Sequence, residues 1–99
     1  MGKVEEFVQL PNGLNEDEDD ALFQAALDVY SMAVDNAGRK PKMTTLVEEF
    51  AEAVLVARGK HDDPLELELK QIASICVNML WQIKLYGDEA VTNLRTERK

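Results

Sequence analysis

The chain has 99 residues, 45% of them hydrophobic, and a net charge of −8 at pH 7. This length suits one domain with a modest core, and the few, scattered Lys and Arg residues argue against a nucleic-acid or membrane-surface partner. A single Cys excludes an internal disulfide, and the distribution of apolar residues leads us to expect neither a signal peptide nor a segment that crosses a bilayer. We therefore expect one cytoplasmic domain.

The first predicted elements are an N-terminal arm, residues 1–15, and a helix, residues 16–38. Pro11-Asn12-Gly13 is a turn signal within the arm. The acidic run 16–20 is favourable at the positive end of a helix dipole, and Gly38 supplies a stop. Apolar residues recur at helical spacing in between and predict a buried face: Leu22, Phe23, Ala26, Leu27, Tyr30, Ala33, Val34 and Ala37.

A compact basic linker, Arg39-Lys40-Pro41-Lys42, separates this helix from the next. Two interpretations stay open. Arg39 and Lys42 could bind phosphates that arrive at the following helix, or the linker could be a polar loop whose cations lie near the negative end of the preceding helix.

Two further helices are predicted over residues 45–59 and 63–87. Thr45 and Glu48 fit the capping box of the first, residues 53–57 are apolar around the whole circumference and should be buried on most sides, and Gly59 is the stop. Asp63 is the expected N-cap of the second, and Gly87 its stop. Segment 88–99 should form a short helix, capped by Asp88 and extending to about Leu94, followed by a tail.

Two pairs of oxygen-bearing residues stand out on these helices. Glu49 with Glu52, and Glu68 with Gln71, have the i, i+3 spacing that places two side chains on one helix face. Two carboxylates about 6 Å apart repel by roughly 3 kcal/mol at an effective dielectric near 20. A half-buried cluster of such acids must be hydrated, protonated or filled by a cation, and an all-oxygen set favours Mg²⁺ over Zn²⁺. The alternative is that Glu49 and Glu52 face bulk water without a role.

A row of polar residues follows one side of the otherwise apolar helix 63–87. Spacings of three and four align Glu68, Gln71, Ser74, Asn78 and Gln82. Such a row predicts the wall of a pocket, in which each polar group needs a hydrogen-bond partner. Trp81 and Tyr86 either stack a nucleobase or serve as core or interface residues.

These motifs resemble the all-α nucleoside triphosphate pyrophosphohydrolases, the MazG-like superfamily. The hallmark is E-E-x-x-E on one helix and E-x-x-D on the next. Glu48-Glu49-Phe50-Ala51-Glu52 matches the first half, and Glu68-Leu69-Lys70-Gln71 matches the second except at its last position. The resemblance covers about residues 20–86.

The resemblance implies Mg²⁺-dependent hydrolysis of an NTP or dNTP between the α and β phosphates, to a nucleoside monophosphate and pyrophosphate, with Mn²⁺ as a possible substitute. Glu49, Glu52 and Glu68 would be metal ligands, and Gln71 would stand at the position of the last acid. Glu48 would orient a water beside its capping role, and Glu49 would join it in catalysis. Asn78 would contact ribose or base.

The resemblance also implies a four-helix core shared between two subunits. We therefore expect an all-α fold in which an antiparallel helical hairpin is completed by a second copy, as a homodimer or a dimer of dimers. Gln71 is the departure from the pattern, because an amide brings a neutral oxygen where a carboxylate brings a full charge. Two other interpretations stay open: a nucleotide- or metal-binding helical dimer with weakened or lost catalysis, and a purely structural helical dimer.

Overall fold

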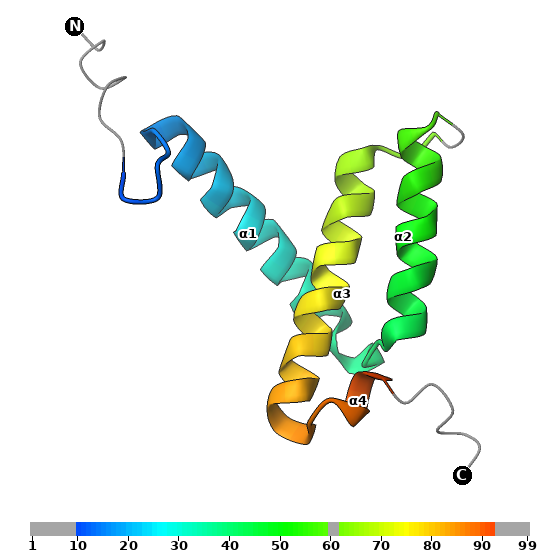
Figure 1. The fold of residues 1–99 in the computed structure, drawn as a ribbon. Coiled ribbons are helices and arrows are strands. Elements are labelled where there is room, and N and C mark those ends of the chain that lie inside the picture. Colours follow the sequence, from blue (N-terminus) through cyan, green and yellow to red (C-terminus); the bar gives the residue numbers. More distant parts are fainter. Residues whose placement is uncertain (1–9, 60–61, 93–99) are drawn as a thin grey trace, which may run out of the picture.

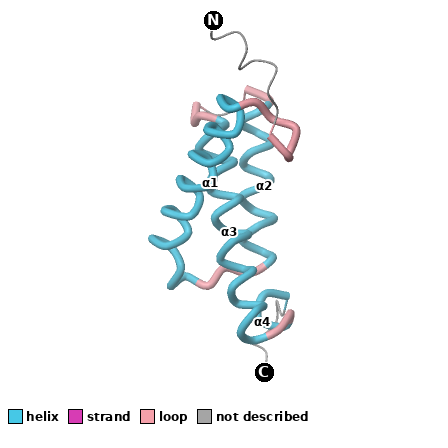
Figure 2. The backbone as a smooth tube through the Cα atoms, turned by 90° about the vertical axis from the view of Figure 1, so that its left-hand side faces the viewer, coloured by secondary structure: helices cyan, strands magenta, loops and turns pink. Residues whose placement is uncertain are grey.

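The structure, a computed structural model, describes residues 10–59 and 62–92, and within these ranges it is entirely helical (Figures 1 and 2). The elements are α1 (Glu16–Asn36), the 3₁₀ turn η2 (Ala37–Arg39), α2 (Met43–Ala57), α3 (Leu65–Tyr86) and α4 (Glu89–Thr92). The all-α expectation is confirmed. No helix in the described part of the chain is both long enough and apolar enough to cross a membrane.

The start of α1 is held by a capping box that was not predicted from the sequence. The Glu18 amide donates to Asn15 Oδ1 at 2.9 Å, and the Asn15 amide donates to Glu18 Oε1 at 3.0 Å. The acidic run occupies the first turn as predicted. The predicted turn before it is also present, because the Gly13 amide donates to the carbonyl of Leu10 at 2.8 Å.

The end of α1 differs from the prediction of a stop at Gly38. The α-helix ends at Asn36, and Gly38 continues inside the 3₁₀ turn rather than terminating it. The chain reverses at Lys40, which takes a left-handed conformation with φ of 48°. Such a conformation is uncommon for a residue with a Cβ. Pro41, which lacks an amide hydrogen, follows directly, so the helical hydrogen-bond pattern cannot continue.

Both predicted caps of the hairpin helices were wrong. Helix α2 begins at Met43, so Thr45 lies inside its first turn and the Thr45–Glu48 capping box is absent; the Lys42 carbonyl accepts the first amide instead. Helix α3 begins at Leu65 with Pro64, not Asp63, at the N-cap position. In both cases backbone carbonyls accept the first helical amides and no side-chain cap is formed.

The predicted glycine stops of the hairpin helices are confirmed. Gly59 and Gly87 follow the two helices with φ of 76° and 87°. A residue with a Cβ is strained at such angles, whereas glycine is not. Helix α4 then begins at Glu89, and the predicted extension to Leu94 lies outside the described residues.

Helix α3 is the centre of the arrangement, because α1, α2 and α4 each pack against it (Figure 1). Helices α2 and α3 form the predicted antiparallel hairpin. Helix α4 returns to the end of α3, where Val91 is 2% exposed, and Lys42 Nζ donates to the Ala90 carbonyl at 2.7 Å. The start of α2 is therefore tied to the far end of α3 through α4.

The apolar face of α1 is not a core face within one chain. All residues from 20 to 28 are exposed, and only Ala33 of α1 is buried. The cause is visible in Figure 1, where α1 meets the hairpin near its C-terminal end and its N-terminal half points away. The prediction of a buried stripe along this helix is thus corrected.

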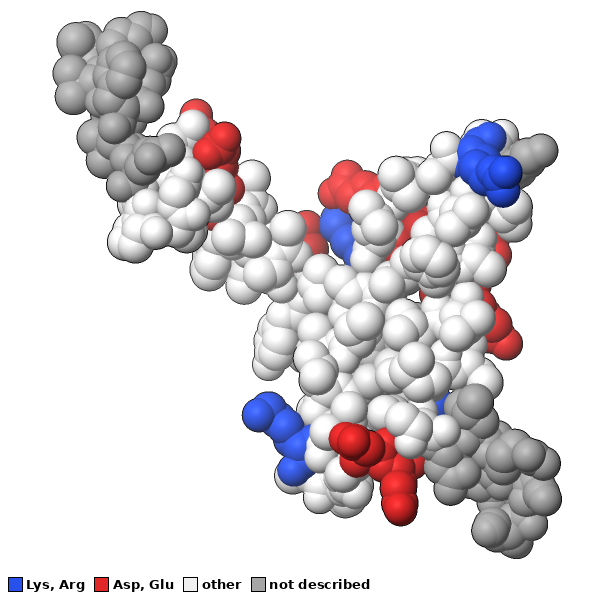
Figure 3. Space-filling view, in the orientation of Figure 1, with Lys and Arg blue, Asp and Glu red and all other residues white. Residues whose placement is uncertain are grey.

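The apolar circumference of α2 is likewise only partly covered. Ala53 and Val56 are buried against α3, whereas Val54 and Leu55 are 36% and 38% exposed. The prediction that residues 53–57 are buried on most sides does not hold within the single chain, because α3 is the one helix that packs extensively against α2. Figure 3 shows the consequence in one view: the middle of the molecule is largely uncharged, and charged side chains gather at the ends and edges.

An ion-pair network joins α1 to α3. Lys70 Nζ lies 3.1 Å from Glu66 Oε2 on its own helix and 3.2 Å from Asp28 Oδ2 on α1. The hydrogen bond to Glu66 and then the one to Asp28 raise the pKa of Lys70 above its ordinary 10.5. A group whose pKa is raised by folding stabilises the fold fully below its unfolded pKa, and this contribution is lost as the pH rises through the folded value.

We therefore expect Lys70→Met to lower the Tm at pH 8, and the difference from the parent to shrink between pH 8 and pH 12, as the pH rises above the ordinary pKa of 10.5 towards the raised folded pKa of Lys70. Thermal melts followed by circular dichroism at both pH values measure this. Lys84→Met, which removes an exposed lysine from the same helix, is the control and should change little at either pH. A difference as large at pH 12 as at pH 8 would contradict the ion-pair origin.

Candidate functional site

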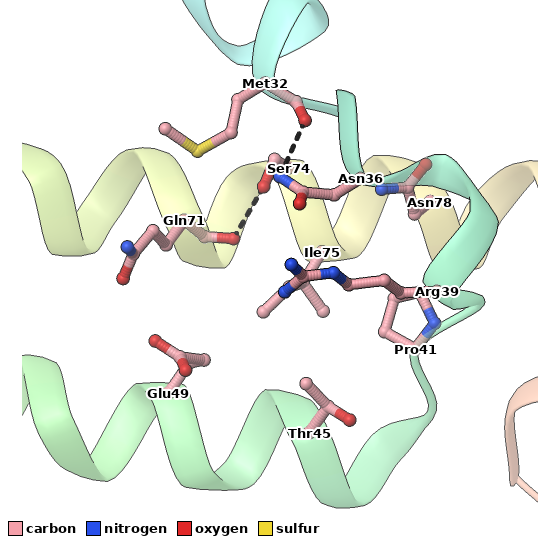
Figure 4. A pocket seen from close by; sticks show the side chains of 10 residues that line it. All are labelled: Met32, Asn36, Arg39, Pro41, Thr45, Glu49, Gln71, Ser74, Ile75 and Asn78. Atoms are coloured by element: carbon pink, nitrogen blue, oxygen red, sulfur yellow. Dashed lines mark hydrogen bonds between the residues drawn. The ribbon is translucent and has the colours of Figure 1, made fainter. Parts of the chain in front are cut away.

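A cavity of about 350 Å³ opens where the end of α1, the linker after η2, the first half of α2 and the middle of α3 meet. Its volume lies at the small end of the range of ligand sites. Ten residues line it (Figure 4): Met32, Asn36, Arg39, Pro41, Thr45, Glu49, Gln71, Ser74, Ile75 and Asn78. Four of them, Arg39, Glu49, Gln71 and Asn78, are candidate site residues from the sequence.

Glu49 and Gln71 face one another across this cavity. The Glu49 side chain rises from α2 and the Gln71 side chain extends from α3 towards it (Figure 4). Both residues are half-buried. This arrangement places a carboxylate and an amide from two helices at one end of the cavity.

The two other predicted metal ligands lie outside the lining. Because α2 and α3 are antiparallel, a step of three residues towards their connecting loop, about 4.5 Å along each helix, leads from Glu49 and Gln71 to Glu52 and Glu68. Glu52 is half-buried and Glu68 is 3% exposed. Among residues 10–59 and 62–92, no group of three or more His, Cys, Asp or Glu side chains is arranged to hold a metal ion.

Glu48 does not share this environment. It is exposed and does not line the cavity, and the capping role assigned to it is absent because α2 begins before Thr45. Thr45 itself is half-buried and lines the cavity near Glu49. Thr45, and not Glu48, therefore lies at the cavity.

The two basic candidates are separated by the fold. The Arg39 side chain extends between α2 and α3, and its guanidinium lies within the cavity near Ile75 (Figure 4). Lys42 is directed to α4, where its Nζ donates to the Ala90 carbonyl. The cavity thus holds one carboxylate, from Glu49, and one guanidinium, from Arg39. It can accommodate a ligand that carries both a cation and an anion.

Most of the polar row of α3 is buried, and three of its members, Gln71, Ser74 and Asn78, line the cavity. Ser74, Asn78 and Gln82 are each 2–3% exposed. Ser74 Oγ donates to the Gln71 carbonyl at 2.9 Å, and Gln82 Nε2 donates to the carbonyls of Pro41 at 3.0 Å and Asn78 at 3.1 Å. The bond to Pro41 fastens the linker against α3, and the linker in turn positions Arg39.

Trp81 supports Asn78 from the next turn of α3. Its Nε1 donates to Asn78 Oδ1 at 3.0 Å, and its ring packs edge-on against Tyr86, with centroids 6.5 Å apart. Trp81 does not line the cavity. Its contacts are those of a supporting residue rather than of a base-stacking platform within this cavity.

Met32, Asn36 and Thr45 line the cavity, although none of them was predicted as a site residue. Asn36 and Met32 come from the end of α1, and Thr45 was assigned to a cap. Asn36 follows the buried Ala33 by three residues, so its helical spacing was the signal that it faces α3. Nothing in the local sequence near Thr45 indicates a cavity, because its position depends on how α2 packs.

Comparison of the chain with protein-family models, with curated proteins and with solved structures finds no match in any of the three.

Proposed function

We propose that the protein is a Mg²⁺-dependent pyrophosphohydrolase that cleaves a nucleoside triphosphate, NTP or dNTP, to the monophosphate and pyrophosphate. The observation that carries the proposal is the pairing of Glu49 with Gln71 across a cavity that also holds the Arg39 guanidinium (Figure 4). A metal–phosphate ligand needs oxygen donors for the cation and a cation for its remaining negative charge. This cavity offers both.

The donor chemistry fits Mg²⁺, since carboxylate and amide oxygens are the ligands that this hard cation takes. Glu49 and Gln71 would hold it from the cavity, whose lining does not include Glu52 and Glu68. Such an ion supplies neutralisation of phosphate charge and a more acidic bound water.

In this proposal Arg39 binds the substrate, and Glu49 has a second role beside holding the cation. Arg39 binds phosphate oxygens through its planar set of N–H donors, for which guanidinium geometry is well suited. Glu49 accepts a hydrogen bond from the attacking water and orients it. Glu48 is exposed and does not line the cavity, so this proposal gives it no catalytic role within a single chain.

Substitution of Glu49 by Gln should abolish turnover. The change keeps the shape but removes the charge and the basic oxygen, so we expect pyrophosphate release to fall at least about 100-fold. A coupled pyrophosphate assay over a panel of NTPs and dNTPs, with Mg²⁺ or Mn²⁺, measures this.

Asp35→Asn, which neutralises an exposed acid of α1, is the control for the loss of one charge and should retain turnover. If the parent protein releases pyrophosphate from no nucleotide of the panel, the enzymatic proposal fails.

Gln71 favours a second candidate function, a nucleotide- or metal-binding protein with weak or no catalysis. Its amide faces Glu49 where the resembling family has an acid, so the site holds one negative charge fewer. Loss of ligand charge weakens Mg²⁺ binding. In this case nucleotides with Mg²⁺ would raise the Tm without forming product.

The isosteric change Gln71→Glu should tighten Mg²⁺ binding roughly tenfold, because a second carboxylate joins Glu49. Isothermal titration with MgCl₂ measures the Kd. Gln24→Glu is the matched control, since it adds the same charge on an exposed position of α1 and should leave the Kd unchanged. Equal effects of both variants would show that overall charge, not the site, governs binding.

We also propose that the chain assembles as a homodimer or a dimer of dimers. On α2, Met43, Val47, Phe50 and Val54 recur at spacings of four, three and four, and each is at least 36% exposed. On α1, Phe23, Leu27, Tyr30 and Val34 repeat the same spacing and are at least 43% exposed. This is the spacing of a helix–helix seam, and a second copy of the chain would cover it.

Replacing Val47 and Phe50 together by Glu should yield a monomer whose helix content is retained. The seam would then carry charges that cannot be buried in an interface. Light scattering at micromolar concentration measures the mass, and circular dichroism the helix content. The same double change at Leu85 and Tyr86, which are exposed at the end of α3, is the control. A monomeric parent would refute the assembly.

A further inference from the structure

The exposed apolar seam of α1 has a symmetric spacing. Steps of four, three and four residues separate its members, which are Phe23, Leu27, Tyr30 and Val34. The order of these steps is the same from either end of the helix. Two copies of the seam can therefore pair in the parallel or the antiparallel direction with every apolar residue against an apolar residue, and the spacing alone does not choose between the two.

The charges of α1 are distributed unevenly along the helix. All of its charged side chains are acidic, and most of them lie in its first five residues, 16–20. The four-three spacing of the seam continues to Asp20 and Glu16, so its N-terminal end is acidic. An exposed cation, Lys40, lies beyond the C-terminal end of the helix. Figure 3 shows the acidic atoms at the start of α1 and an uncharged surface further along it.

This distribution of charge favours the antiparallel direction. In a parallel pair, Glu16 and Asp20 would each face the same residue of the second copy, and the two acidic first turns would repel one another. In an antiparallel pair, the acidic first turn of each copy lies beside the C-terminal end of α1 of the other copy, where Lys40 follows. The positive end of each helix dipole then also lies beside the negative end of the other.

We infer that α1 pairs with α1 of a second copy in the antiparallel direction. In this register, Phe23 lies opposite Val34 near each end of the pair. Leu27 lies opposite Tyr30 at its centre. The N-terminal half of α1 points away from the hairpin (Figure 1) and leaves room for a second helix. The inference rests on the proposed assembly, adds the direction and register of one of its contacts, and does not depend on the proposed enzymatic activity.

The α1 pair joins dimers that are held through α2. Helix α1 extends to one side of α3 and α2 lies on the other (Figure 1), so their seams form separate contacts. Four side chains from each copy are far fewer than the roughly 20–30 residues a side of a stable interface, so a single α1 pair does not hold two chains together. Between two dimers, two such pairs form, and the second forms within the complex. The assembly is therefore a dimer of dimers.

The mass in solution tests this role of α1. Light scattering at micromolar concentration should give four chains for the parent protein. Phe23→Glu together with Tyr30→Glu should halve the mass, because charges in the seam prevent its burial while the α2 seam is unchanged. Ala21→Glu together with Gln24→Glu adds the same charge at exposed positions outside the seam and should leave four chains. Circular dichroism checks that each variant keeps its helix content.

Disulfide cross-linking tests the direction. Phe23→Cys and Val34→Cys are made separately, each with Cys76→Ala because the native cysteine is free. Co-expressed and oxidised, the two variants should form a mixed disulfide, which non-reducing electrophoresis detects if one variant carries a tag. Each variant alone should not cross-link, because equivalent positions lie about 16 Å apart along an antiparallel pair, beyond the roughly 7 Å limit for the two Cα atoms. A parallel pair gives the reverse result.

A charge reversal tests the direction without cysteines. Asp20→Lys places a cation beside Lys40 of the other copy and should raise the dimer–tetramer Kd at least about fivefold, since it replaces attraction by repulsion in both α1 pairs. Adding Lys40→Glu to this variant should restore the Kd to within twofold of the parent value. Analytical ultracentrifugation measures the Kd. In a parallel pair these two positions lie at opposite ends, and the second change would not restore it.

Three results would overturn the inference. The first is a parent protein with a mass below four chains. The second is an unchanged mass when the α1 seam carries the two glutamates. The third is a cross-link within each cysteine variant alone, or a charge reversal that the second change does not rescue. If the cysteine variants fail to assemble, the charge reversal decides the direction. Pyrophosphate release by the parent shows separately whether the proposed enzymatic function stands.

Discussion

The burial of polar side chains along α3 is the constraint on which the rest of the structure depends. Ser74, Asn78 and Gln82 are almost fully enclosed, and an enclosed polar group without a hydrogen-bond partner is costly. Gln82 finds one of its partners in the linker carbonyl of Pro41 and Asn78 finds its partner in Trp81. The bond from Gln82 to Pro41 anchors the linker on α3 and thereby holds the end of α1 and the start of α2 beside the same cavity.

The anchored linker supplies the positively charged group of the cavity. Arg39 belongs to the short segment that Gln82 holds in place, so its guanidinium enters the space between the hairpin helices (Figure 4). Glu49 and Gln71 depend on the register of α2 against α3 instead. The oxygen donors for a cation and the donors for an anion are thus supplied by different parts of the fold, and a ligand with charges of both signs suits them.

The same fold leaves much apolar surface uncovered. A chain of this size buries a smaller fraction of its surface than a larger domain does, and α1 contacts the hairpin along only part of its length (Figure 1). Phe23 and Tyr30 on α1 and Val47 and Phe50 on α2 are each at least 60% exposed. Exposed apolar patches of this kind are typical of interaction surfaces, and this is the basis of the proposed assembly.

Local sequence signals determined the helices and several of their limits. Apolar spacing indicated the helices, Gly59 and Gly87 ended two of them at positive φ, and the regular polar spacing from Gln71 to Gln82 predicted a buried row. These properties depend on residues within one or two helical turns. The predicted caps at Thr45 and Asp63 failed because several neighbouring residues could begin each helix, and the backbone took the first turn elsewhere.

Tertiary packing alone decided which candidate residues meet. The motifs predicted the side chains of Glu49 and Gln71 at one place, but they did not separate Arg39 from Lys42, exclude Glu48 from the cavity or include Asn36. Each of these outcomes depends on the angle at which α1 crosses α3 and on where the linker is fastened, contacts between residues far apart in sequence. The amino-acid pattern thus determined helices with polar and apolar faces, and the packing of those faces determined the cavity.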